Sequence, residues 1–228
     1  MKNKRQMQMQ IVCMSVLACG LHAAMLHTQF NQYFYTSVLK TILFALCPVV
    51  FHRISPAGRL QGLLFNNGDR QRLRQSLALG LFVFLFAFAA FAVLRPLLDP
   101  AMVVGALSDV GITGSSYPYV FLYVLLVNAA MEELFFRGFV FLNLFRMGFK
   151  RFAHVFSSLL FALYHVSVLK SGAAPGVLLL GIGGLVAAGL VFNELARRCD
   201  GIAGSLPVHA GANLAINMIG AYYLYVQP

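Results

Sequence analysis

The chain has 228 residues, of which 60% are hydrophobic and only 11% are charged. An average soluble domain has roughly 25% charged residues, and the mean hydropathy here is +0.77. These values exclude an ordinary soluble protein and predict a single polytopic membrane domain. The net charge of +10 does not indicate nucleic-acid binding, because the basic residues lie in short clusters between apolar runs.

Seven apolar segments of transmembrane-helix length predict an all-α bundle of about seven spans. They cover Ile11–His27, Tyr33–Phe51, Ser76–Leu94, Tyr117–Phe145, Phe152–Leu169, Gly176–Leu195 and Ser205–Val226. We interpret the first as a retained helix, with a cleaved signal peptide as the alternative. Residues 1–116 then hold the N-terminal helices and a basic loop, and residues 117–228 hold the helices of the predicted catalytic core.

Lys40 and Arg137 lie within predicted spans, and the other Lys and Arg residues divide unevenly between the two sides of the spans. One side receives Lys2, Lys4, Arg5, Arg53, Arg59, Arg70, Arg72, Arg74, Arg146, Lys150, Arg151, Arg197 and Arg198. The other side has only Arg95 and Lys170. The positive-inside rule therefore places the N-terminus in the cytoplasm and the C-terminus outside. We expect a multi-pass protein of a bacterial cytoplasmic (inner) membrane.

The polar residues inside the predicted spans are concentrated in the C-terminal half. Tyr117–Phe145 contains Glu132, Glu133 and Arg137, whereas the first three spans contribute mainly His22 and Lys40. A charged side chain at membrane depth costs about 2.5–3.5 kcal/mol on insertion scales, so such a cluster indicates a functional site. The cluster must face the bundle interior or a wet cavity.

The spacing of these residues predicts different roles for the two glutamates. Glu133 and Arg137 are four residues apart and pair along one helix, which favours a structural ion pair. Glu132 points about 100° away from Glu133 on an α-helix and has no ion partner on its own helix, which favours chemistry. Counted by helix rise, His165 and His209 reach a similar depth. Asn213 follows His209 by one turn.

Three motifs in this order resemble the CPBP family of intramembrane proteases, which includes the type II CAAX prenyl endopeptidases and the bacterial Abi-type proteins. The motifs are EExxxR at Glu132–Arg137, FxxxH at Phe161–His165 and HxxxN at His209–Asn213. The resemblance covers roughly residues 127–219. It implies a glutamate-dependent endopeptidase in which Glu132 activates water with help from His165. His209 and Asn213 would stabilise the oxyanion, and Glu133 and Arg137 would support the site.

Two other readings stay open. Glu132, His165 and His209 could together bind zinc as a metalloprotease, although the HExxH helix of many such enzymes is absent. Acidic and histidine residues within spans also mark proton-coupled transporters, and a non-catalytic membrane protein belongs to the same alternative. We expect no cofactor, no metal and no nucleic-acid partner. The expected partners are the lipid bilayer and a peptide or protein substrate at the membrane, and the sequence leaves the oligomeric state open.

Overall fold

Helices form all the regular secondary structure in the part of the chain that the computed structural model describes, namely residues 2–28, 30, 32–55, 70–97, 99–166 and 175–226. The separate helices are α1 (Lys2–Met25), α2 (Tyr33–Ile54), α3 (Arg70–Leu94), α4 (Pro100–Asp109), α8 (Lys150–Val166), α9 (Pro175–Cys199) and α10 (Leu206–Tyr225). Short 3₁₀ turns, η1 (Arg95–Leu97) and η4 (Ile202–Gly204), follow α3 and α9. The all-α prediction is confirmed for the described residues.

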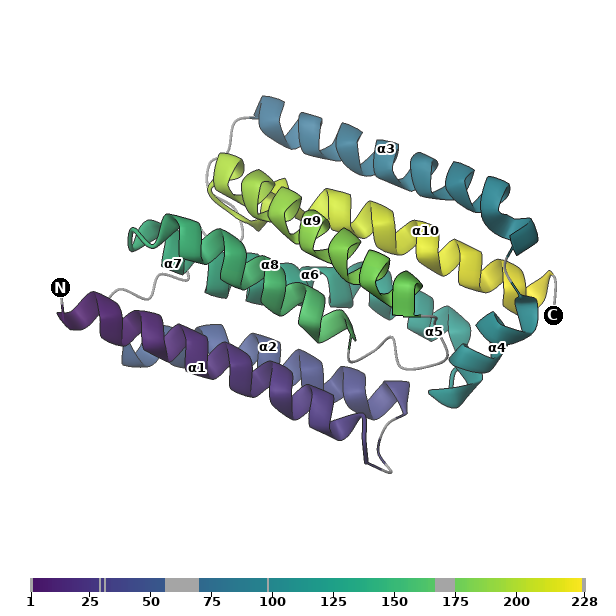
Figure 1. Cartoon of the computed structure of the whole chain (residues 1–228), viewed down its shortest axis with the longest axis horizontal. Helices are drawn as coiled ribbons and strands as arrows, with labels where there is room; N and C mark the ends of the chain where they lie inside the picture. Colours follow the sequence, from purple (N-terminus) through teal and green to yellow (C-terminus); the bar gives the residue numbers. More distant parts are fainter. Residues whose placement is uncertain are drawn as a thin grey trace.

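One longer helical path runs from Tyr117 to Arg146 through the middle of the molecule. It consists of α5 (Tyr117–Leu122), η2 (Tyr123–Asn128), α6 (Ala129–Glu132), η3 (Glu133–Leu142) and α7 (Asn143–Arg146). Figure 1 shows this central helix between the α1–α2 pair on one side and α9, α10 and α3 on the other. All the long helices run roughly along the same axis, as a membrane bundle requires.

Five described helices are long and apolar enough to cross a membrane: Asn3–Met25, Tyr33–Ile54, Arg70–Val93, Tyr117–Arg146 and Leu178–Cys199. The chain is therefore a multi-pass membrane protein. These five correspond to the predicted spans one to four and six. The predicted fifth span forms α8, of which residues 167–169 lie outside the described part. The seventh forms α10, whose apolarity is lowered by His209, Asn213 and Asn217, so the total of seven spans remains a prediction.

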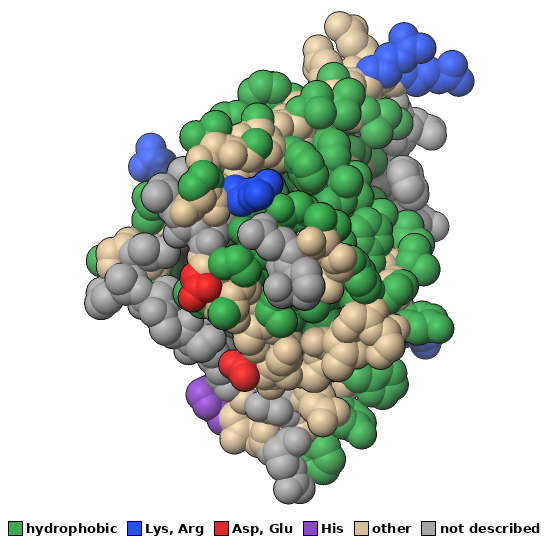
Figure 2. Space-filling model, turned by 90° about the vertical axis from the view of Figure 1, so that its right-hand side faces the viewer, with side chains coloured by type: hydrophobic (Ala, Val, Ile, Leu, Met, Phe, Trp, Pro, Cys, Tyr) green, Lys and Arg blue, Asp and Glu red, His purple; other side chains and the backbone are tan. Residues whose placement is uncertain are grey.

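The basic clusters, where the structure describes them, lie at one end of the bundle. The N-terminus, the start of α3, α7 and the turn between α9 and α10 all lie at this end in Figure 1. Arg146 binds Asp200 at 2.8 Å, and Arg72 donates to the carbonyl of Arg198. The opposite end, near α4 and the C-terminus, presents mainly hydrophobic side chains (Figure 2). Which end faces the cytoplasm remains a prediction.

The helix α4 lies between the third and fourth predicted spans and is not among the predicted helices. Its local signals are nevertheless regular. The Asp99 carboxylate accepts a hydrogen bond from the Ala101 amide at 3.0 Å, and Pro100 occupies the first helical position. Both features favour a helix start.

The central helix is not a uniform α-helix, although the predicted faces of Glu132 and Glu133 assume an α-helical period throughout. The segments η2 and η3 are π-helical, with i→i+5 hydrogen bonds. Such segments are rare and often mark functional sites. Side chains complete part of the altered backbone bonding: Asn143 donates to the Phe139 carbonyl at 2.9 Å, and Ser157 donates to the Phe136 carbonyl at 3.0 Å.

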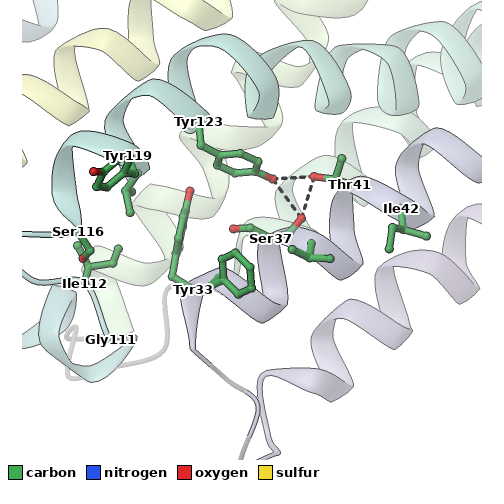
Figure 3. A pocket seen from close by; sticks show the side chains of 12 residues that line it. Tyr33, Ser37, Thr41, Ile42, Gly111, Ile112, Ser116, Tyr119 and Tyr123 are labelled. Atoms are coloured by element: carbon green, nitrogen blue, oxygen red, sulfur yellow. Dashed lines mark hydrogen bonds between the residues drawn. The ribbon is translucent and has the colours of Figure 1, made fainter.

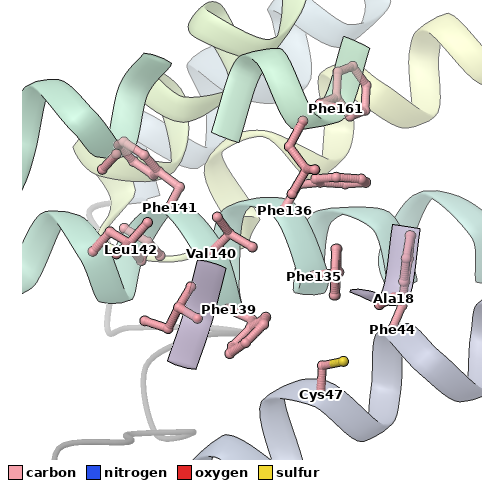
Figure 4. Packing of buried hydrophobic residues seen from close by; sticks show 14 of the residues in the cluster. Ala18, Phe44, Cys47, Phe135, Phe136, Phe139, Val140, Phe141, Leu142 and Phe161 are labelled. Carbon is pink, nitrogen blue, oxygen red and sulfur yellow. The ribbon is translucent and has the colours of Figure 1, made fainter. Parts of the chain in front are cut away.

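A cluster of aromatic side chains surrounds η3. Phe135, Phe136 and Phe139 are fully buried, and Phe44 of α2 stacks on Phe135 with ring centroids 4.0 Å apart (Figure 4). Because lipid tails are as apolar as these rings, close packing rather than exclusion from water holds membrane helices together. The cluster fixes α2 against the central helix and thereby sets the position of α2 side chains near Glu132.

Glycine allows α3 to lie directly on α10. A Cβ atom on Gly80 would overlap the backbone of Pro207, and one on Gly211 would overlap the backbone of Gly80. Small residues at such contacts let the backbones of membrane helices approach closely. This contact supports the first turns of α10, which carry His209.

Candidate active site

Glu132 lies in the middle of the central helix and is buried, with 2% of its surface exposed. Its Oε2 atom lies 3.5 Å from His209 Nε2 and 3.7 Å from His165 Nε2. Within the described residues this oxygen accepts no hydrogen bond. A buried carboxylate oxygen without a donor is costly unless a water molecule or a ligand completes it.

The other oxygen of Glu132 has two neighbours from other helices. Lys40 Nζ of α2 lies 3.5 Å from Oε1, and the Tyr164 hydroxyl of α8 lies 3.4 Å from it. Lys40 also donates to the side-chain carbonyl of Asn128, one turn before Glu132. The two carboxylate oxygens therefore face different surroundings: a cation and a hydroxyl on one side, and two imidazoles on the other.

Glu133 is completely buried and has three partners. Arg137 Nη1 lies 2.9 Å from its Oε1, His209 Nδ1 lies 2.8 Å from the same atom, and the Ser205 hydroxyl donates to Oε2. The π-helical start of η3 thus keeps the predicted pairing of Glu133 with Arg137. It also brings Glu133 to the histidine that Glu132 faces, which the sequence analysis did not predict.

Arg137 is enclosed by aromatic rings. Its guanidinium carbon lies 4.2 Å from the Phe161 ring centroid and 4.8 Å from that of Phe192. Its nitrogens make no hydrogen bond of regular geometry within the described residues, so the ion pair with Glu133 and the ring faces together balance the buried charge. No part of Arg137 is exposed at the surface of the described structure.

The imidazole of His209 connects the two glutamates. Its Nδ1 is hydrogen-bonded to Glu133, which leaves Nε2 as the ring nitrogen directed at Glu132. The ring also stacks on Phe192, with centroids 5.3 Å apart and planes 20° apart. A histidine held at one nitrogen by a carboxylate has a fixed ring orientation, which is the usual way to aim the second nitrogen.

His165 is oriented by its own helix. Its Nδ1 lies 2.8 Å from the Phe161 carbonyl, and a carbonyl only accepts, so Nδ1 carries the proton and donates it. In the neutral ring, Nε2 then presents a lone pair toward Glu132. About a quarter of the His165 side chain is exposed, in contrast to the buried His209.

Asn213 lies one turn beyond His209 on α10, as the HxxxN spacing requires. Its amide donates to the Val124 carbonyl of η2 at 3.4 Å, a long hydrogen bond. The structure therefore gathers Glu132, His165 and His209 around one point, and Glu133 and Arg137 behind them. Asn213 borders this group with its amide turned to the backbone of the central helix.

Three neighbours of the two glutamates were absent from the sequence-based site: Lys40, Tyr164 and Ser205. Ser205 and Tyr164 carry no recognisable signal, because a hydroxyl in or beside an apolar helix usually has only a structural role. Lys40 did carry one. A lysine within an apolar segment of transmembrane length is as costly as the glutamates, yet nothing in the spacing indicated its partner on another helix.

A separate apolar cavity of about 710 Å³ lies between α2, the turn before α5 and the start of the central helix. Its wall includes Tyr123, whose hydroxyl lies 2.9 Å from that of Thr41 and donates to the Ser37 carbonyl (Figure 3). None of the six predicted site residues lines it. Tyr123 links the cavity to the site through Lys40, whose Nζ lies 5.6 Å from the Tyr123 ring centroid and 3.5 Å from Glu132 Oε1.

The comparison with known proteins agrees with the order of the motifs. Residues 114–215 match the model of a family described as type II CAAX prenyl endopeptidase Rce1-like. The matched segment contains Glu132, Glu133, Arg137, His165, His209 and Asn213, but not Lys40. No curated protein and no solved structure matches the chain.

Proposed function

We propose that the chain is a glutamate-dependent intramembrane endopeptidase, because residues 114–215 match the model of the type II CAAX prenyl endopeptidase Rce1-like family. Its substrate is a membrane-associated peptide or protein, of the CAAX type or a processed bacterial peptide. The observation that carries the proposal is the free Oε2 of Glu132 facing two imidazole nitrogens in a buried site.

In this mechanism Glu132 and His165 bind the attacking water. Glu132 Oε2 and His165 Nε2 are 3.7 Å apart, so one water molecule reaches both when it lies off the line that joins them. Glu132 takes a proton from this water as hydroxide adds to the carbonyl carbon of the peptide, and the leaving amine receives that proton when the C–N bond breaks. General-base catalysis of this kind contributes about 10²–10⁴-fold in rate.

The oxyanion of the tetrahedral intermediate needs donors close to the same point. With a proton on Nε2, His209 donates to this oxygen, and Glu133 holds the ring in the required orientation. The amide of Asn213 donates as well once it turns from the Val124 carbonyl, to which it makes only a long bond. Removal of one oxyanion donor typically costs about 10²–10³ in rate.

Zinc binding by Glu132, His165 and His209 is less favourable on electrostatic grounds. Among the described residues, no group of three or more His, Cys, Asp and Glu side chains is arranged to hold a metal ion. Lys40 Nζ also lies 3.5 Å from Glu132 Oε1, and an ammonium so close to a ligand repels a divalent cation. We therefore expect activity without zinc.

The test is cleavage of a synthetic peptide library by the purified chain in lipid nanodiscs, followed by mass spectrometry. Wild type should cleave a subset of peptides, with and without a strong chelator, and Glu132→Gln should cleave none while remaining folded. Near wild-type activity of Glu132→Gln would exclude the proposed base. Activity that chelation removes and zinc restores would move the site to the metalloprotease class. No cleavage by any form would favour a transporter or a non-catalytic membrane protein.

A further inference from the structure

The charges around the site come in two pairs, and only one pair belongs to the recognised motifs. Glu133 is paired with Arg137, four residues later on the same helix. Glu132 is paired with Lys40, which lies on α2 and outside the segment that matches the family. Burial of an unbalanced charge is strongly unfavourable. The first glutamate of the EExxxR motif, Glu132, therefore has its counter-charge in the N-terminal part of the chain.

Contacts with three neighbouring side chains hold Lys40 in place. Its side chain is 8% exposed, and its ammonium group donates to Asn128 and lies next to Glu132. The face of the Tyr123 ring, 5.6 Å away, closes a further side. Asn128 and Tyr123 both belong to η2, so the π-helical segment provides the contacts that hold the lysine.

We propose that Lys40 is a positioning residue for the reaction: it holds Oε1 of Glu132 so that Oε2 remains directed at His165 and His209. A carboxylate has two equivalent oxygens, and without a fixed partner its terminal torsion is broad. An ammonium on one oxygen removes this freedom and leaves the other oxygen for water. This inference rests on the proposed function for its catalytic consequence, but the link between Lys40 and Glu132 can be measured without any activity.

The first experiment measures that link through thermal unfolding. Lys40→Met is made in the wild type and in Glu132→Gln, in nanodiscs, and unfolding is followed by the reactivity of the buried Cys19 and Cys47. In the wild type, Lys40→Met leaves the buried Glu132 carboxylate without its counter-charge. We therefore expect the fall in Tm caused by Lys40→Met to be at least twice as large in the wild type as in the Glu132→Gln background. Equal shifts in the two backgrounds would overturn the inference. Thr41→Val is the matched control, because Thr41 lies on the same helix but is hydrogen-bonded to Tyr123 rather than to Glu132. It should change Tm by the same amount in the wild type and in Glu132→Gln.

The second experiment measures the catalytic consequence on the fastest peptide of the library. Lys40→Met should lower kcat by about 10- to 100-fold, the scale of a misplaced catalytic group, and leave KM within about twofold. Lys40→Arg keeps the charge and should recover part of kcat, whereas Thr41→Val should retain wild-type kcat.

Each outcome of this pair of experiments has one meaning. An unchanged kcat in folded Lys40→Met, or a loss confined to KM, would overturn the positioning role. If the wild type cleaves no peptide, the proposed function fails, and the unfolding experiment still decides whether Lys40 holds Glu132.

Discussion

Replacement of Glu133 by glutamine keeps the shape of the side chain and removes its charge. In the folded chain this leaves the guanidinium of Arg137 without its counter-ion, in a place where both side chains are completely buried and 2.9 Å apart. Breaking a buried pair by neutralising one partner typically costs about 3–5 kcal/mol. For globular chains of this size 1 kcal/mol corresponds to roughly 2–4 °C, so we expect Tm to fall by roughly 6–20 °C.

The chain offers its own probe and its own control for this measurement. It has no Trp, but Cys19 and Cys47 are buried and should react with a thiol dye only on unfolding. The measurement uses a Cys13→Ser, Cys199→Ser background, because Cys13 is exposed and Cys199 is partly exposed. Glu194→Gln is the matched control, since Glu194 binds arginines three and four residues later at 2.7 and 2.8 Å but is 35% exposed. Exposed pairs contribute about 0–1 kcal/mol, so its Tm should change by less than about 4 °C.

If Glu133→Gln lowers Tm no more than Glu194→Gln does, the Glu133–Arg137 pair does not balance a costly buried charge. The double variant Glu133→Gln, Arg137→Met provides a second check, because it removes both charges. It should be less destabilised than the sum of the two single variants, and strict additivity would argue against the pair.

Three further predictions concern the oxyanion donor, the helix contact and the topology. Asn213→Ala should lower kcat by about 10²–10³-fold in the peptide assay. Its Tm should change little, because the Asn213 amide makes only a long bond to Val124, and a large fall in Tm would instead indicate a structural role. Gly80→Leu should destabilise the chain by about 1–3 kcal/mol, because its side chain overpacks α3 against Pro207 of α10. The same thiol-based unfolding measures this loss, and an unchanged stability would mean that the two helices separate freely. In a Cys-free background, Ser115→Cys should be labelled from outside intact cells by an impermeant reagent and Lys150→Cys should not, and the reverse pattern would overturn the orientation derived from the basic clusters.

Local features of the sequence were sufficient to predict the helical bundle and most residues of the candidate site. Apolar length predicts helices because a membrane-spanning backbone must satisfy its own hydrogen bonds. Spacing within one helix predicts that Glu133 and Arg137 meet, because residues four apart share a helix face. The order of the three motifs selected Glu132, His165 and His209, and the structure places both imidazoles within 3.7 Å of Glu132 Oε2. Their catalytic roles remain a proposal.

Contacts between helices were decided only by the tertiary structure. Lys40 reaches Glu132 because stacked rings such as Phe44 and Phe135 fix the rotation of α2 against the central helix. Glu133 reaches His209 because η3 is π-helical and α10 lies close to it. A sequence pattern specifies which residues share a face of one helix, but the rotation and depth of each helix relative to its neighbours depend on packing over the whole bundle. Apolar length and motif spacing, which are local, therefore select the residues that we propose as the reacting groups, whereas the counter-charge of Glu132 and the orientation of His209 required the folded molecule.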